Sequence, residues 1–149
     1  MAHHLTVIGL SHIGKIRGRN EDSLSLVPDA GVAVLADGMG GHPGGDVASR
    51  IAAETASAHL RQLLPLDPDA AGENVTARLS RAMAESAMRA HTAIRSEGAG
   101  DSELEGMGTT LTALAVDADT GVFAIVNVGD SRAYRFSDGK LVQLTRDDT

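Results

Sequence analysis

The segment VLADGMGGHPGGD, residues 34–46, combines a carboxylate with unusual backbone freedom. Its apolar beginning predicts a buried strand that ends at Asp37, and a glycine-rich stretch follows directly. Three structures are compatible with such a segment: an ordinary glycine-rich turn, a loop that cradles phosphate, and the edge of a metal site. Glycine tolerates positive φ angles and close backbone approach in all three, so the glycines alone do not decide between them.

The phosphate-cradling alternative lacks the residues it requires. A P-loop needs a lysine directly after its last glycine, and the chain contains no lysine between Lys15 and Lys140. A dinucleotide-binding loop needs the pattern G-x-G-x-x-G, but counting from Gly38 the last of these positions is Pro43. A simple turn and a metal-site edge therefore remain open.

Two further acidic segments favour the metal site. The stretch RGRNEDS sets Glu21 beside Asp22 before a predicted strand, and VNVGDSRAYRF ends another apolar strand just before Asp130. Taken alone, the first segment is more typical of a solvated charged turn, and the second of an ordinary hairpin with an Asp-Ser turn. Magnesium and manganese ions prefer oxygen ligands, so three acidic strand ends in one chain favour a shared cation site. Asp37 and a neighbouring glycine carbonyl would be ligands, and Glu21 and Asp22 could hold the water around the ion.

Composition excludes several other classes of protein. The chain has 149 residues, of which 42% are hydrophobic, enough for one domain with a core. A formal net charge of -7 argues against nucleic acid as the main partner. No apolar stretch approaches the roughly 20 residues of a membrane span, so we expect a cytoplasmic protein without a membrane segment. The absence of cysteine excludes a thiolate nucleophile and leaves metals, carboxylates or serine.

The elements that must position these acids follow from the hydrophobic pattern. Apolar residues at four-residue spacing predict two helices, and apolar runs or alternating residues predict strands before and after them. This order favours an α+β fold in which an antiparallel sheet carries helices on one face. The expected strands cover 5–12, 23–27, 31–37, 109–116, 121–128, 131–136 and 141–144, and the expected helices cover 46–64 and about 74–96.

Four motifs in this order resemble the N-terminal part of the bacterial metal-dependent serine/threonine protein phosphatases, the type-2C (PPM) family. They are RGRNEDS, LADGMGGHPGGDVAS, GMGTTLTALAV and VNVGDSRAYRF. The resemblance implies a four-layer αββα fold, with two antiparallel sheets in a sandwich flanked by helices. Residues 1–149 would be the N-terminal part of one catalytic domain, C-terminally truncated, with no second domain. The implied activity is hydrolysis of phosphoserine and phosphothreonine by a metal-activated water, and the implied partners are phosphorylated substrates of bacterial kinases.

The resemblance also assigns metal-binding roles to particular residues. Asp37 matches the aspartate that bridges two Mn²⁺ or Mg²⁺ ions, and Gly38 matches the residue that gives one ion its backbone carbonyl. Glu21 and Asp22 match the acidic pair around metal-bound water. Asp130 matches an aspartate associated with a third, more weakly held ion.

The remaining roles include one match and two departures. Arg17 matches the arginine that binds the substrate phosphate. Some relatives have a histidine directly after the Asp-Gly pair as general acid, but here that position is Met39, and His42 is expected to be a loop residue. The family's other metal-ligand aspartates lie in a C-terminal stretch that is absent here, so we expect this fragment to be inactive alone. The alternative is a phosphatase-like binding or regulatory module.

Overall fold

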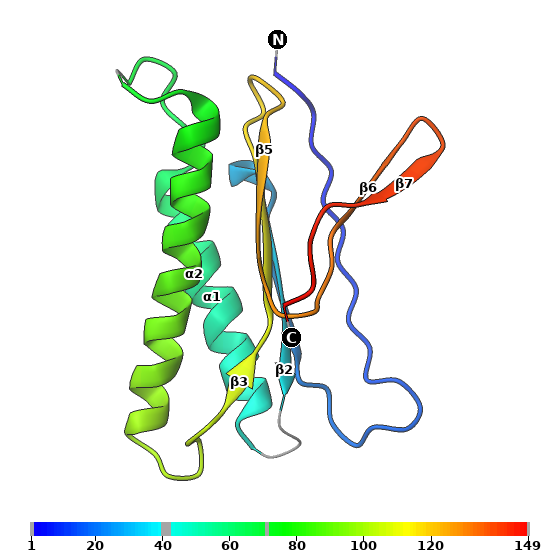
Figure 1. The fold of residues 1–149 in the computed structure, drawn as a ribbon, viewed down its shortest axis with the longest axis vertical. Coiled ribbons are helices and arrows are strands. Elements are labelled where there is room, and N and C mark those ends of the chain that lie inside the picture. Colours follow the sequence, from blue (N-terminus) through cyan, green and yellow to red (C-terminus); the bar gives the residue numbers. More distant parts are fainter. Residues whose placement is uncertain (1, 40–42, 71, 149) are drawn as a thin grey trace.

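The computed structural model describes residues 2–39, 43–70 and 72–148. Its main antiparallel sheet has the strand order β1-β2-β4-β5, with the short β3 paired to the end of β2. Helices α1 and α2 cover one face of this sheet (Figure 1). The elements are β1 (Asp22–Val27), a 3-10 turn (Pro28–Ala30), β2 (Val32–Met39), α1 (Gly45–Leu63), α2 (Val75–Ala99), β3 (Gly108–Thr109), β4 (Leu111–Val116), β5 (Phe123–Val128), β6 (Tyr134–Ser137) and β7 (Lys140–Gln143).

The core lies between the sheet and the two helices. Along β2, Val32, Val34 and Ala36 are buried, as the period of two in a strand requires when one face meets a core. They belong to one buried cluster with small residues of α1, such as Ala52 and Ala56. Because alanine side chains are short, α1 can lie close to the sheet, in which β2 lies between β1 and β4.

Both predicted helices are confirmed, with small shifts at their ends. The end of α1 falls at Leu63, just before Pro65, which cannot continue a helix. The start of α2 is capped by Asn74, whose side chain accepts the Ala77 N–H at 2.8 Å. This helix continues to Ala99, three residues beyond the expected end. None of the helices in the described part of the chain is long and apolar enough to cross a membrane.

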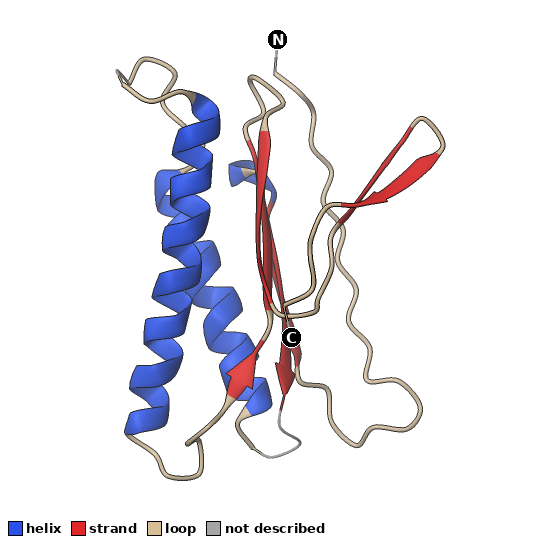
Figure 2. Ribbon diagram, viewed as in Figure 1, coloured by secondary structure: helices blue, strands red, loops and turns tan. Residues whose placement is uncertain are grey.

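The far face of the sheet carries two less regular segments. Figure 2 shows the N-terminal segment and the β6–β7 hairpin on the side of the main sheet opposite the helices. The hairpin forms a second, two-stranded antiparallel sheet, in which Phe136 pairs with Leu141. Both side chains are exposed, at 72% and 65%. The layered α+β prediction is therefore confirmed, with one face of the main sheet much better covered than the other.

Three strand predictions need correction. The strand expected at 109–116 is divided into β3 and β4, with Thr110 between them. Residues 5–12 form no strand, although the segment lies over β1 closely enough for Gly9 to pack against Leu26. Their weak alternation indicates which side chains face the sheet, but a strand also needs a neighbour for its backbone hydrogen bonds. The strand expected at 131–136 begins only at Tyr134, because the preceding residues contact the C-terminal segment instead.

Candidate metal and phosphate site

Two carboxylates face each other at one end of the main sheet. In the antiparallel register of β1 and β2, Asp22 lies directly opposite Asp37. Like charges in this position repel each other and destabilise a sheet. The pKa of Asp37 is raised, first by partial desolvation at the strand end and then by the hydrogen bond and the negative charge of Asp22. A cation at this position would offset the repulsion.

Asp130 and Arg17 contribute further charge to the same place. The negative charge of Asp130 raises the pKa of Asp37, and the Arg17 guanidinium lowers it. Arg17 also lines a cavity of about 250 Å³ together with Glu21, Asp22 and Asp37. The predicted phosphate-binding arginine and the predicted acids are therefore neighbours, although they come from three separate segments of the chain.

The carboxylate of Glu21 is incompletely satisfied. Its Oε1 atom is buried and has no hydrogen-bond partner among the described residues. A buried carboxylate oxygen without a donor is costly unless an ion or water binds to it. The nearby Arg19 does not fill this role, because its Nη2 atom donates to Asp46 at 2.8 Å. Glu21 is thus a suitable group to hold a cation or its water.

Position 38 requires glycine because neighbouring backbone segments pack closely against it. Its N–H donates to the Glu21 carbonyl oxygen at 3.0 Å, which fixes the acidic segment against the end of β2. A Cβ atom at this position would lie 2.0 Å from the Gly45 carbonyl oxygen and 2.8 Å from that of Glu21. From the sequence, Gly38 could have been needed either for a positive φ angle or for close approach of two backbone segments. The structure shows that close approach is the reason. Gly40, Gly41 and His42 lie outside the described residues.

Two residues that were not predicted from the sequence connect Asp37 with the segment of Asp130. Thr110 accepts the Asp37 N–H through its Oγ1 at 3.0 Å, and its own N–H donates to the Asp37 carbonyl oxygen at 2.9 Å. The same Oγ1 lies 2.7 Å from the Ser131 Oγ atom. Thr110 therefore holds the end of β2 against the residue that follows Asp130. The sequence features that could have indicated this contact are the second threonine of GMGTTLT, which is Thr110, and the serine of VGDSR, which is Ser131.

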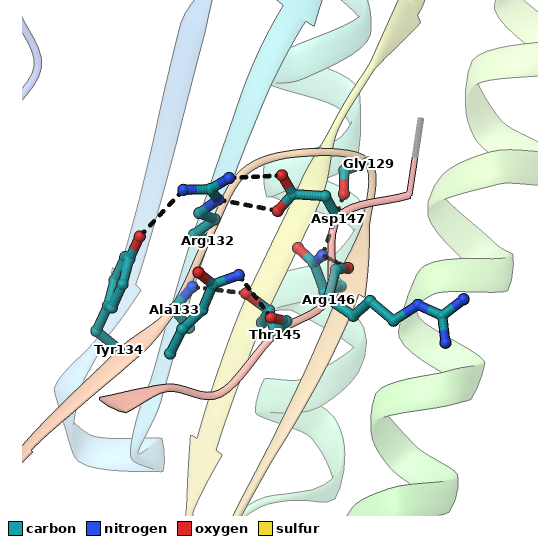
Figure 3. A network of polar contacts seen from close by, with 9 residues as sticks. Gly129, Arg132, Ala133, Tyr134, Thr145, Arg146 and Asp147 are labelled. Atoms are coloured by element: carbon teal, nitrogen blue, oxygen red, sulfur yellow. Dashed lines mark hydrogen bonds and ion pairs between the residues drawn. The ribbon is translucent and has the colours of Figure 1, made fainter. Parts of the chain in front are cut away.

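An ion pair between Arg132 and Asp147 holds the C-terminal segment beside Asp130, and this contact was not predicted from the sequence. Figure 3 shows Arg132 donating to both carboxylate oxygens of Asp147, at 2.9 and 2.7 Å, and to the Tyr134 hydroxyl at 3.4 Å. This guanidinium lowers the pKa of Asp147. The backbone N–H of Asp148 also donates to the Gly129 carbonyl oxygen at 2.9 Å.

The donor set fits one edge of a hard-cation site. Asp22, Asp37 and Asp130 offer carboxylate oxygens, the chemistry that Mg²⁺ and Mn²⁺ select. Within residues 2–39, 43–70 and 72–148, no three acidic or histidine side chains are arranged to enclose an ion by themselves. Met39, which follows the Asp-Gly pair, is 53% exposed and offers no proton to a leaving group.

Comparison with known proteins decides the family. Residues 8–149 match the family described as protein phosphatase 2C. The chain belongs to the protein phosphatase 2C family. The serine/threonine protein phosphatase PstP of Mycobacterium tuberculosis is 42% identical over 137 residues, which cover 91% of this chain and 24% of that protein. The serine/threonine phosphatase stp of Listeria monocytogenes is 36% identical over 137 residues, covering 90% of this chain and 51% of that protein.

Solved phosphatase 2C structures share the fold. The crystal structure of M. tuberculosis PstP/Ppp superposes with a TM-score of 0.75 at 36% identity, covering 94% of this chain and 53% of that one. The PstP catalytic domain in complex with two manganese ions gives a TM-score of 0.69 at 38% identity, covering 94% and 54%. These matches confirm the predicted family and fold class. The chain spans about half the length of these solved structures and a quarter to a half of the two relatives described above.

Proposed function

We propose that residues 1–149 form the N-terminal part of one type-2C catalytic domain, which hydrolyses phosphoserine and phosphothreonine in proteins. The observation that carries this proposal is the facing pair of Asp22 and Asp37, beside the unsatisfied Glu21 oxygen and the Arg17 guanidinium. Such a cluster is unfavourable by itself and becomes favourable when it binds a cation and a phosphate. Family membership supplies independent support.

The cofactor that we propose is a pair of Mn²⁺ or Mg²⁺ ions, with a third ion held more weakly. The related PstP catalytic domain binds two manganese ions. Asp37 and the Gly38 carbonyl would hold the pair, and Asp130 the third ion. When bound, such ions would lower the pKa of a water and stabilise the charge on the attacking and leaving oxygens. Glu21 and Asp22 would accept hydrogen bonds from water and orient it.

Arg17 would bind the phosphate group of the substrate. A guanidinium presents its N–H donors in a planar fork, which matches two phosphate oxygens better than an ammonium group does. Arg17 is exposed and lines the same cavity as Asp37, so a phosphate can reach it from solvent. With a water as nucleophile, the reaction requires no cysteine, and the chain has none.

The substrates in this proposal are phosphorylated proteins of the cytoplasm, modified by bacterial serine/threonine kinases. The names of the Mycobacterium and Listeria relatives support the residue specificity. A non-catalytic binding module is the second candidate. The described residues favour it in one respect, because they do not enclose a metal ion by themselves.

Release of phosphate from a phosphothreonine peptide distinguishes the two candidates. We expect little Mn²⁺-dependent release by residues 1–149 alone. We expect strong release after this chain is joined to the remaining residues of the M. tuberculosis PstP catalytic domain, which shares its fold. An Asp37→Asn version of the same chimera should be inactive. A folded chimera that binds phosphopeptide but never releases phosphate would support the binding module instead.

A further inference from the structure

The Glu21 carboxyl group occupies the space that a side chain at position 45 would need. Gly45 is the first residue of α1 and is buried. A Cβ atom there would lie 2.7 Å from Glu21 Oε1, 2.8 Å from its Cδ and 3.1 Å from its Oε2. The first two distances are too short for a side chain to coexist with Glu21 in its present orientation, and the third is tight. The Oε1 atom involved is the buried oxygen without a partner among the described residues.

We propose that Gly45 is a positioning residue for the metal site. By having no side chain, it lets the Glu21 carboxylate lie against the first turn of α1 and reach the cavity that contains Asp37. This inference rests on the proposed function only in assigning the cation. The steric relation between Gly45 and Glu21 stands without it.

The backbone on both sides of this contact makes hydrogen bonds or ion pairs with its neighbours, whereas the carboxylate is the end of a flexible side chain. The Gly38 N–H holds the Glu21 carbonyl oxygen, and the ion pair of Arg19 with Asp46 joins the acidic segment to α1. A methyl group at position 45 would therefore displace the flexible end of Glu21 rather than the helix. The positive end of the α1 dipole also favours a carboxylate at this position. Gly45 thus determines where one charge of the site lies without touching an ion itself.

The test is the affinity of residues 1–149 for Mn²⁺, followed by the electron paramagnetic resonance signal of the free ion. We expect Gly45→Ala to raise the Kd for Mn²⁺ by about tenfold or more, the usual effect of losing a group behind the direct ligands. Gly98→Ala is the matched control, because a Cβ atom there meets nothing closer than 3.4 Å. It should leave the Kd unchanged. Glu21→Gln should reproduce the loss, and Gly45→Ala combined with Glu21→Gln should add nothing further.

Two results would overturn the inference: wild-type Mn²⁺ affinity in Gly45→Ala, or a double variant whose loss equals the product of the two single losses. If Gly45→Ala lowers the melting temperature strongly, Gly45→Ala combined with Glu21→Ala should restore it, because the clashing group is gone. If Gly45→Ala combined with Glu21→Ala melts as low as Gly45→Ala alone, Glu21 is not the group that clashes with a side chain at position 45. If residues 1–149 alone bind too little Mn²⁺ to titrate, the same affinities are measured in the chimera with the PstP residues, and no Mn²⁺ binding there would mean that the proposed cofactor fails. The pair of melting temperatures tests the steric relation in either case.

Discussion

Asp37 and Asp147 are carboxylates at the same end of the fold with opposite surroundings. Asp147 lies in the fork of Arg132, and its pKa is lowered. Asp37 faces Asp22, and its pKa is raised. The charge of Asp147 is neutralised by Arg132 within the protein, and Asp147 has a structural role. Asp37 is left beside a second negative charge, and this difference is the reason that we propose a cation site at Asp37 and only an ion pair at Asp147.

The largest effect on folding stability that we expect comes from a substitution at Gly38, which packs the backbone beside Asp37. Gly38→Ala should lower the free energy of unfolding by about 1–3 kcal/mol, the usual cost of forcing a methyl group into packed surroundings. The reason is that the atoms nearest the new methyl are backbone carbonyl oxygens, 2.0 and 2.8 Å away, which cannot turn aside. Urea unfolding followed by circular dichroism measures the change. Gly98→Ala, at a helical glycine with room for a methyl group, is the control and should cost little.

Arg17→Ala should weaken phosphate binding without affecting the metal. Charged hydrogen bonds contribute roughly 1.5–3 kcal/mol, so KM for a phosphopeptide should rise about 10- to 100-fold in the active chimera. Arg19→Ala is the matched control, because Arg19 is engaged with Asp46 and should change KM much less. Equal effects of the two variants would remove the phosphate-binding role from Arg17.

Neutral substitutions of the two carboxylates should change metal-free stability in opposite directions. Because the folded-state pKa of Asp37 lies above its unfolded value, its ionisation destabilises the fold, fully above the folded pKa and not at all below the unfolded one. Asp147 has a lowered folded-state pKa, so it stabilises the fold above its unfolded pKa, and this contribution is lost as the pH falls through the folded value.

Near pH 7 without metal, Asp37→Asn should therefore melt slightly higher than the wild type, and Asp147→Asn slightly lower. Both differences should shrink as the pH falls into the range where carboxylates become protonated. Melting curves recorded with a chelator between pH 7 and pH 3 would measure them. A decrease in melting temperature for both variants at pH 7 would contradict the opposite pKa shifts.

The elements that carry the site could be predicted because their patterns are local. The apolar spacing of α1 and α2 and the apolar runs of β2, β4 and β5 each indicate one type of structure. The acids at the strand ends were found in the same way, from their position next to these runs. Residues 5–12 show the limit of this reasoning, since alternation says which face a side chain occupies but not whether a neighbouring strand exists.

The contacts within the site could not be predicted, because they depend on pairing between distant segments. Asp22 faces Asp37 only through the register of β1 and β2, and a shift of one residue would separate them. Thr110 reaches Asp37 from 73 residues away. The Arg132–Asp147 pair depends on the path of the C-terminal segment, to which no sequence pattern points. The role of Gly45 is visible only once the Glu21 side chain is placed.

Titration of Mn²⁺ into residues 1–149 by calorimetry, comparing Asp37→Asn with Asp147→Asn, tests the central claim most directly. Both variants lose one negative charge from the same end of the molecule, so a general electrostatic effect would weaken Mn²⁺ binding similarly in each. Because residues 1–149 form one edge of the site, we predict weak but saturable Mn²⁺ binding by the wild type, a Kd at least about tenfold higher for Asp37→Asn, and an unchanged Kd for Asp147→Asn. Wild-type affinity in Asp37→Asn, or equal losses in both variants, would contradict the assignment of Asp37 to a metal site.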